Sequence, residues 1–168
     1  MVRDVFLLGL FPAVMAFAAA SDLVTMTISN RLSLFLAASF FVAAAIIGMP
    51  LVQVGYHVAA GALVLTVAFG LFAAGWIGGG DAKLAAATAM WMGFTDLLQY
   101  LFLASILGGV LTLLLLSMRR MPLPSPLAGT PWIARLHDAG TGVPYGIALA
   151  AAGLLVYPKT PFMHALAG

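Results

Sequence analysis

Two aspartates, Asp22 and Asp81, are the residues whose type and position best suit catalysis. Each stands at the edge of a long apolar stretch, where an ionisable side chain is costly to place and usually serves a function. Two carboxyl groups that meet can share one proton. The ionised group then acts as a base toward water, and the protonated group polarises a carbonyl. If the fold brings these two residues to one depth, the sequence predicts peptide-bond hydrolysis by an aspartic pair.

The remaining acidic residues fit ordinary structural roles. Asp4 and Asp96 begin apolar stretches, where a carboxylate favours a helix N-terminus, and Asp138 lies in a polar loop. The chain has no cysteine, and its three histidines are scattered without metal-ligand spacing. The sequence therefore predicts catalysis without a metal or any other cofactor.

A run of three glycines, Gly78, Gly79 and Gly80, directly precedes Asp81. Glycines let the backbone turn tightly and let a substrate strand come close. The alternative is a purely structural turn before a helix that an aspartate caps. The run alone does not decide between these two interpretations.

The composition places these residues in a membrane. The chain has 168 residues, of which 64% are hydrophobic and 7% are charged, and its mean hydropathy is +1.14. Soluble domains carry about 25% charged residues, and so short a chain cannot bury this much apolar surface away from water. A soluble enzyme and a disordered tail are excluded, and a formal charge of +2 is too small to indicate a nucleic-acid partner.

Hydropathy divides the chain into six apolar segments of about membrane length. We expect them at residues 4–21, 32–49, 52–75, 81–94, 96–118 and 143–157. The predicted fold is an all-α, polytopic bundle of about six transmembrane helices, which forms a single membrane domain over residues 1–168. Residues 119–142 hold four prolines and are predicted to form a proline-rich loop rather than a continuous helix.

The basic residues orient this bundle. Six alternating spans put most of the lysines and arginines on one side, namely Arg31, Lys83, Arg119, Arg120 and Arg135. Basic loops face the cytoplasm, so residues 119–142 are expected there and both termini outside. The same topology places Asp22 and Asp81 at the cytoplasmic face.

Three short motifs, in chain order, resemble those of one protease family. Asp22 begins a segment that ends in Ile28-Ser29-Asn30, residues 78–81 fit a G-x-G-D signature, and Pro144-Tyr145 opens the last predicted helix. Together they resemble the type IV prepilin peptidases, which are bacterial membrane aspartic proteases of the G-x-G-D type. The motifs span nearly the whole chain. One departure is Ser29, which stands where many members have proline.

The resemblance implies that Asp22 and Asp81 are the catalytic pair. It also implies supporting roles for the glycine run and for Asn30, Lys83, Pro144 and Tyr145. The expected substrate is a prepilin with a short basic leader and a hydrophobic helix, cut after a glycine at the cytoplasmic face of the bacterial inner membrane. The chain lacks the cysteine-bearing insertion of the long bifunctional members. It therefore resembles the short, peptidase-only branch of Flp/Tad-type pili, and N-methyltransferase activity is not expected.

Several supporting residues have two possible roles. Lys83 would either contact a lipid phosphate, which we favour, or tune Asp81. Asn30 would hydrogen-bond within the turn after Asp22. Tyr145 would line a cleft or belong to an interfacial aromatic belt.

Other functions also remain open at this stage. Archaeal preflagellin peptidases share the same core. A small proton-coupled transporter would use the two acids as a proton relay, and a non-catalytic assembly subunit would only bind pilin helices. A relay would place its acids near mid-membrane, often within repeated halves, whereas here both acids lie at one face and no repeat is visible.

Helix dipoles suggest different roles for the two acids. Asp81 opens a predicted helix, where the positive end of the dipole favours an ionised carboxylate. Asp22 closes one, where the negative end disfavours a second charge. The sequence therefore predicts that Asp81 activates water and that Asp22 carries the shared proton.

Overall fold

The computed structural model describes residues 2–167, and the regular structure in that range is helical throughout. The elements in chain order are α1 (Val2–Thr25), α2 (Asn30–Ile46), α3 (Leu51–Ala73), α4 (Gly79–Arg119), α5 (Ser125–Ala128), α6 (Pro131–His137), α7 (Tyr145–Val156), the 3-10 helix η1 (Tyr157–Lys159) and α8 (Pro161–Ala167). The all-α fold class is therefore confirmed.

Within residues 2–167, three helices are long and apolar enough to cross a membrane. These stretches are Arg3–Thr25, Leu51–Ala73 and Gly79–Arg119. Two shorter apolar stretches, Asn30–Ile46 and Tyr145–Lys159, lie beside them. The chain is thus a helical membrane protein, while a bundle of six spans remains a prediction.

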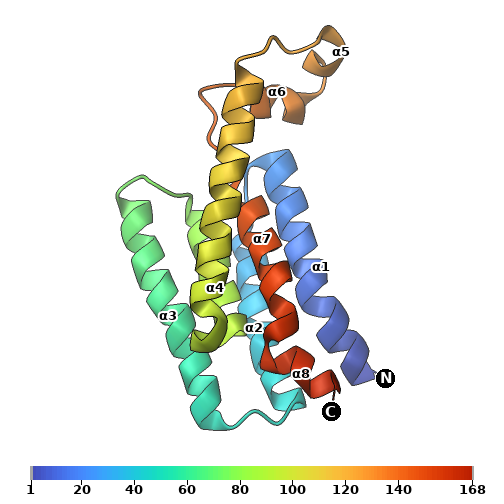
Figure 1. The fold of residues 1–168 in the computed structure, drawn as a ribbon, viewed down its shortest axis with the longest axis vertical. Coiled ribbons are helices and arrows are strands. Elements are labelled where there is room, and N and C mark those ends of the chain that lie inside the picture. The colour runs from blue at the N-terminus through green and yellow to red at the C-terminus, as the bar shows by residue number, and fades with distance from the viewer. Residues whose placement is uncertain (1, 168) are drawn as a thin grey trace.

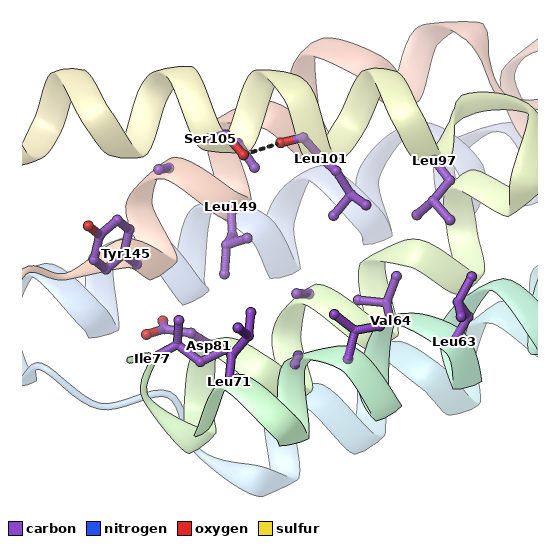
Figure 2. Close-up of a pocket in the computed structure, with 15 residues that line it drawn as sticks. Leu63, Val64, Leu71, Ile77, Asp81, Leu97, Leu101, Ser105, Tyr145 and Leu149 are labelled. Atoms are coloured by element: carbon purple, nitrogen blue, oxygen red, sulfur yellow. Dashed lines mark hydrogen bonds between the residues drawn. The ribbon is translucent and has the colours of Figure 1, made fainter. Parts of the chain in front are cut away.

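Helix α4 is a hairpin of two helical arms rather than one straight rod. Gly93 has φ 63° and ψ 179°, which interrupts the helix between residues 79–92 and 94–119. Ala85 and Leu101 line the same cavity, although a straight helix would hold them about 24 Å apart. Figures 1 and 2 show the chain reversing at this point. The two segments expected at residues 81–94 and 96–118 correspond to these arms.

His57 of α3 contacts the backbone at the reversal and stabilises it. Its Nδ1 lies 2.7 Å from the backbone oxygen of Met90, to which it donates a hydrogen bond. A Cβ atom added to Gly93 would lie 2.7 Å from Cε1 of the same ring. The hairpin therefore requires glycine at Gly93 for two reasons, the positive φ and the close ring.

An aromatic core joins the helices on the side of the reversal. Phe11 of α1 stacks on Tyr157, with ring centroids 4.4 Å apart, and also packs against Trp91 of α4. Trp91 donates from Nε1 to the backbone oxygen of Leu36 at 2.9 Å, and the hydroxyl of Tyr157 donates to that of Leu7 at 2.6 Å. These contacts fix α1, α2, α4 and η1, which directly follows α7, relative to one another.

Residues 119–142 fold over one end of the bundle. As predicted, this segment is no continuous helix, and its short helices α5 and α6 both begin at or beside a proline. Arg119 donates to the backbone oxygens of Leu136 and Gly142, and Arg135 donates to that of Val24 at 3.0 Å. The segment is therefore held against the ends of α1 and α4, and both chain termini lie at the opposite end of the molecule (Figure 1).

The C-terminal region holds two short elements that the sequence did not predict. The chain continues past α7 into η1 and α8, whose Phe162 is fully buried. Phe162 packs on Trp91, with ring centroids 4.9 Å apart. This short helix closes the aromatic core, which hydropathy alone does not reveal.

Replacing Gly93 should destabilise the hairpin. We expect Gly93→Ala to cost about 1–3 kcal/mol, because only glycine occupies this backbone region without strain. Thermal unfolding in detergent measures the effect. Gly109→Ala is the matched control on the same element, because a Cβ there meets nothing within 4 Å. Equal melting temperatures for the two variants would contradict the hairpin.

Candidate active site

Asp22 lies in the last turn of α1 and is buried, with 4% of its surface exposed. The helix ends three residues later, and Met26 then takes a left-handed conformation with φ 55°. Its N–H donates to the backbone oxygen of Asp22 at 2.8 Å, which is a common way to close a helix. This turn directs the following residues back toward α4 and α7.

The carboxylate of Asp22 accepts a hydrogen bond from a distant helix. The backbone N–H of Gly146 donates to its Oδ2 at 2.7 Å. Gly146 is the second residue of α7, so this N–H has no partner inside its own helix. Asp22 therefore faces the positive end of α7. The Asp22 carboxylate therefore meets the N-terminus of α7 as well as the C-terminal turn of α1, which the dipole argument did not include. The assignment of the shared proton to Asp22 stays a prediction.

The buried side chain of Ile28 lies between the N-termini of α4 and α7 and is called the wedge below. A Cβ atom on Gly146 would lie 2.6 Å from Cδ1 of Ile28 and 2.7 Å from Oδ2 of Asp22. A Cβ atom on Gly80 would lie 3.2 Å from Cβ of Ile28. Gly80 and Gly146 thus let the turn after α1 touch both α4 and α7.

Asp81 lies in the first turn of α4 and is half-buried. It accepts a backbone hydrogen bond from Gly78, the N-cap residue of this helix. This is the backward-reaching half of a capping box, in which an acid in the first turn bonds the cap backbone. A Cβ atom on Gly78 would lie 2.9 Å from Oδ2 of Asp81, so glycine lets the carboxylate approach.

The two aspartates line one cavity of about 450 Å³ at the end of the bundle where α1 finishes and α4 begins. The other lining residues are Met26, Gly75, Trp76, Ile77, Gly78, Gly142, Val143 and Tyr145. The fold therefore brings together two acids that are far apart in the sequence.

Pro144 and Tyr145 form the start of α7 at this cavity. Pro144 is the buried N-cap residue, and Tyr145 lines the cavity itself. The Tyr145 hydroxyl lies 3.0 Å from Oγ1 of Thr112, and its ring lies against Gly108, where a Cβ atom would come within 2.9 Å. Of the two roles left open for Tyr145, this position matches the lining of a cleft.

An apolar groove of about 390 Å³ continues from Asp81 along the bundle. Figure 2 shows Asp81, Ile77 and Tyr145 at one end of it and leucine side chains beyond them. Its walls come from α3, both arms of α4 and α7, and include Leu63, Leu71, Leu97, Leu101 and Leu149. The site thus combines a pair of carboxyl groups with a long apolar surface.

Asn30 and Lys83 lie outside this cavity. Lys83 donates from Nζ to Oδ1 of Asn30 at 2.7 Å, and both residues line a different hollow between α2, α3 and α4. The predicted bond of Asn30 within its own turn is thus replaced by a bond to Lys83. Of the glycine run, Gly78 lines the cavity, whereas a Cβ atom added to Gly79 would lie 3.3 Å from the ring of Phe72.

Sequence reasoning missed Ile28 and Gly146 as parts of the site. Ile28 stood inside a motif that carried the resemblance and Gly146 directly follows another, but neither has a side chain that does chemistry. The available signal was a glycine directly after Pro144-Tyr145. Among the described residues, no group of three histidine, cysteine or acidic side chains could hold a metal ion.

Comparison with known proteins identifies a family. The model of the type IV leader peptidase family matches residues 9–113, which is more than half of the chain. The matched region includes Asp22, the glycine run and Asp81, whereas Tyr145 lies beyond it. No curated protein and no solved structure matches this chain.

A disulfide would test the geometry around Ile28, because the natural chain has no cysteine. A Cβ atom added to Gly80 would lie 3.2 Å from Cβ of Ile28, a few tenths of an ångström below the usual disulfide range. The pair Ile28→Cys/Gly80→Cys should therefore cross-link on mild oxidation, as seen by altered migration on a non-reducing gel. The pair Ile28→Cys/Gly79→Cys is the control, and equal cross-linking of both pairs would contradict the wedge.

Proposed function

Because the chain belongs to the type IV leader peptidase family, we propose that it is a membrane aspartic endopeptidase. Its substrates are Flp-like prepilins, from which it removes the short basic leader at the cytoplasmic face of the bacterial inner membrane. The observation that carries this proposal is the shared cavity of Asp22 and Asp81 at one end of the bundle.

The two carboxyl groups suffice for hydrolysis if they share one proton. The ionised group takes a proton from a water molecule, whose oxygen attacks the scissile carbonyl carbon. The protonated group gives its proton to the carbonyl oxygen, which yields a diol. The diol then loses the C–N bond: the nitrogen takes the proton that came from water, and a diol hydroxyl returns a proton to the other carboxylate, which restores the resting pair. Atoms and charges balance without a cofactor. Each carboxyl group also receives a backbone hydrogen bond, which holds it in place.

The apolar groove supports a substrate with a hydrophobic helix. It begins at Asp81 and is walled by aliphatic side chains, so a helix lying in it would present its polar end to the two acids. The scissile bond of a prepilin lies at such a boundary between leader and helix. The substrate class thus matches the arrangement of cavity and groove.

The distribution of basic residues supports a cytoplasmic site. Arg31 and Lys83 lie in the first turns of α2 and α4, and Arg119 ends α4. These positions lie at the same end of the bundle as the two acids and residues 119–142. Because basic residues are retained on the cytoplasmic side, this end is assigned to the cytoplasm and the termini to the outside.

The first functional prediction concerns the pair itself. Asp22→Asn and Asp81→Asn should each lower kcat/KM for a purified prepilin by about 10²–10⁴-fold, because each removes one member of the acid–base pair. Cleavage is measured by mass spectrometry of the released leader. Asp138→Asn and Asp96→Asn are the controls and should keep most activity. Near-normal cleavage by either pair variant would disprove the proposed function.

The second functional prediction concerns Gly146. Gly146→Ala should lower kcat by about 10²-fold, because the new methyl group would displace the Asp22 carboxylate. Gly142→Ala is the matched control, since it borders the same cavity but a Cβ there meets nothing within 4 Å. If both variants cleave prepilin at the same rate, Asp22 is not held in the way described.

A further inference from the structure

A second groove lies on the other side of the first arm of α4. It has a volume of about 520 Å³ and runs between α2, α3 and residues 79–92. Neither Asp22 nor Asp81 lines it, so it is separate from the cavity that we assign to hydrolysis. The proposed function makes no use of this groove.

One end of the groove is polar and carries a positive charge. The ammonium group of Lys83 has three N–H donors, and one of them bonds Oδ1 of Asn30 at 2.7 Å. Ser33 lines the same groove and is 5% exposed, and its Oγ has no hydrogen-bond partner within the part of the chain that the structure describes. A buried hydroxyl without a partner is costly, and a ligand oxygen would remove this cost.

The rest of the groove is apolar. Its walls include Leu34 and Ala37 of α2, Val58 and Leu65 of α3, and Met90 of α4. The floor is narrow because α3 and α4 pack closely at Gly61, where a Cβ atom would come within 2.3 Å of Cγ of Met90. Leu34, Val58 and Leu65 are exposed at the outer surface of the bundle, so the groove opens toward the hydrocarbon of the bilayer.

We propose that this groove binds one anionic phospholipid. The phosphate lies at Lys83, Asn30 and Ser33, and one acyl chain lies along α2 and α3. An ammonium group beside hydrogen-bonding side chains suits a phosphate, and the adjoining apolar walls suit a hydrocarbon chain. A hydrophobic peptide helix would fill the walls but offer no anion to Lys83. Anionic lipids are abundant in the leaflet that basic residues face.

The bound lipid would join two helix starts. Asn30 begins α2 and Lys83 lies in the first turns of α4, two positions after Asp81. A phosphate that contacts both residues holds these turns together beside the turn that carries Ile28. The lipid therefore acts as a positioning ligand for the end of the bundle, and its binding does not depend on peptidase activity.

Native mass spectrometry of the full chain in detergent tests the headgroup part of the proposal. The probes are phosphatidylglycerol and phosphatidylcholine with identical acyl chains. The wild type should bind phosphatidylglycerol more tightly, and Lys83→Gln should weaken this binding by about fivefold to tenfold. Glutamine keeps a donor for Asn30, so the fold is retained. Arg120→Gln removes an exposed cation outside the groove and should bind like the wild type. Equal affinities for the two lipids, or for wild type and Lys83→Gln, would overturn the proposal.

A second pair of measurements tests the acyl chain and its competitor. Ala37→Phe should fill the groove and lower binding of phosphatidylglycerol by tenfold or more. A photoreactive side chain at Leu34, activated in membranes that hold both phosphatidylglycerol and prepilin, should form a lipid adduct, identified by its mass. Unchanged binding by Ala37→Phe would refute the groove as the chain site. A prepilin adduct in place of the lipid adduct would reassign the groove to the substrate helix.

Discussion

The hydrogen bond from the backbone of Gly146 to the carboxylate of Asp22 is the interaction on which the site depends. It joins residues 124 positions apart and fixes the end of α1 against the start of α7. The bond exists because a helix N-terminus leaves its first N–H groups unpaired and because glycine lets the carboxylate approach. Ile28 occupies the remaining space and also touches Gly80, so the same turn positions α4 and, through it, Asp81.

The second constraint is the reversal at Gly93. Without it, the arm that carries Asp81 would continue straight, and the long groove beside Asp81 would lose one wall. The reversal returns the second arm along the first, so that Leu97 and Leu101 line the same groove as Asp81 (Figure 2). Backbone geometry at one residue, supported by His57, therefore builds the surface that the substrate helix would use.

The sequence predicted those features that depend on local composition. The lengths of the apolar segments predicted the helices and the break near residue 95. The two aspartates were singled out because an ionisable side chain at the edge of an apolar segment is costly to place. Contacts between distant backbones leave no such local signal. Gly146 and Ile28 were therefore missed, and α8 was missed because its burial depends on Trp91. The dipole argument was incomplete for the same reason, since it considered α1 alone, whereas Asp22 also faces the N-terminus of α7. Lys83 likewise meets Asn30, far away in the sequence, and not Asp81.

The central claim is that Asp22 and Asp81 share one proton and act as a unit. Infrared spectroscopy of the resting protein measures it most directly, because a protonated carboxyl group has its own C=O stretching band and the chain has only five acidic residues. The account predicts one such band that disappears in both Asp22→Asn and Asp81→Asn, since the lone remaining carboxyl group ionises when its neighbour's charge is removed. A band that persists unchanged in either variant would contradict the shared proton.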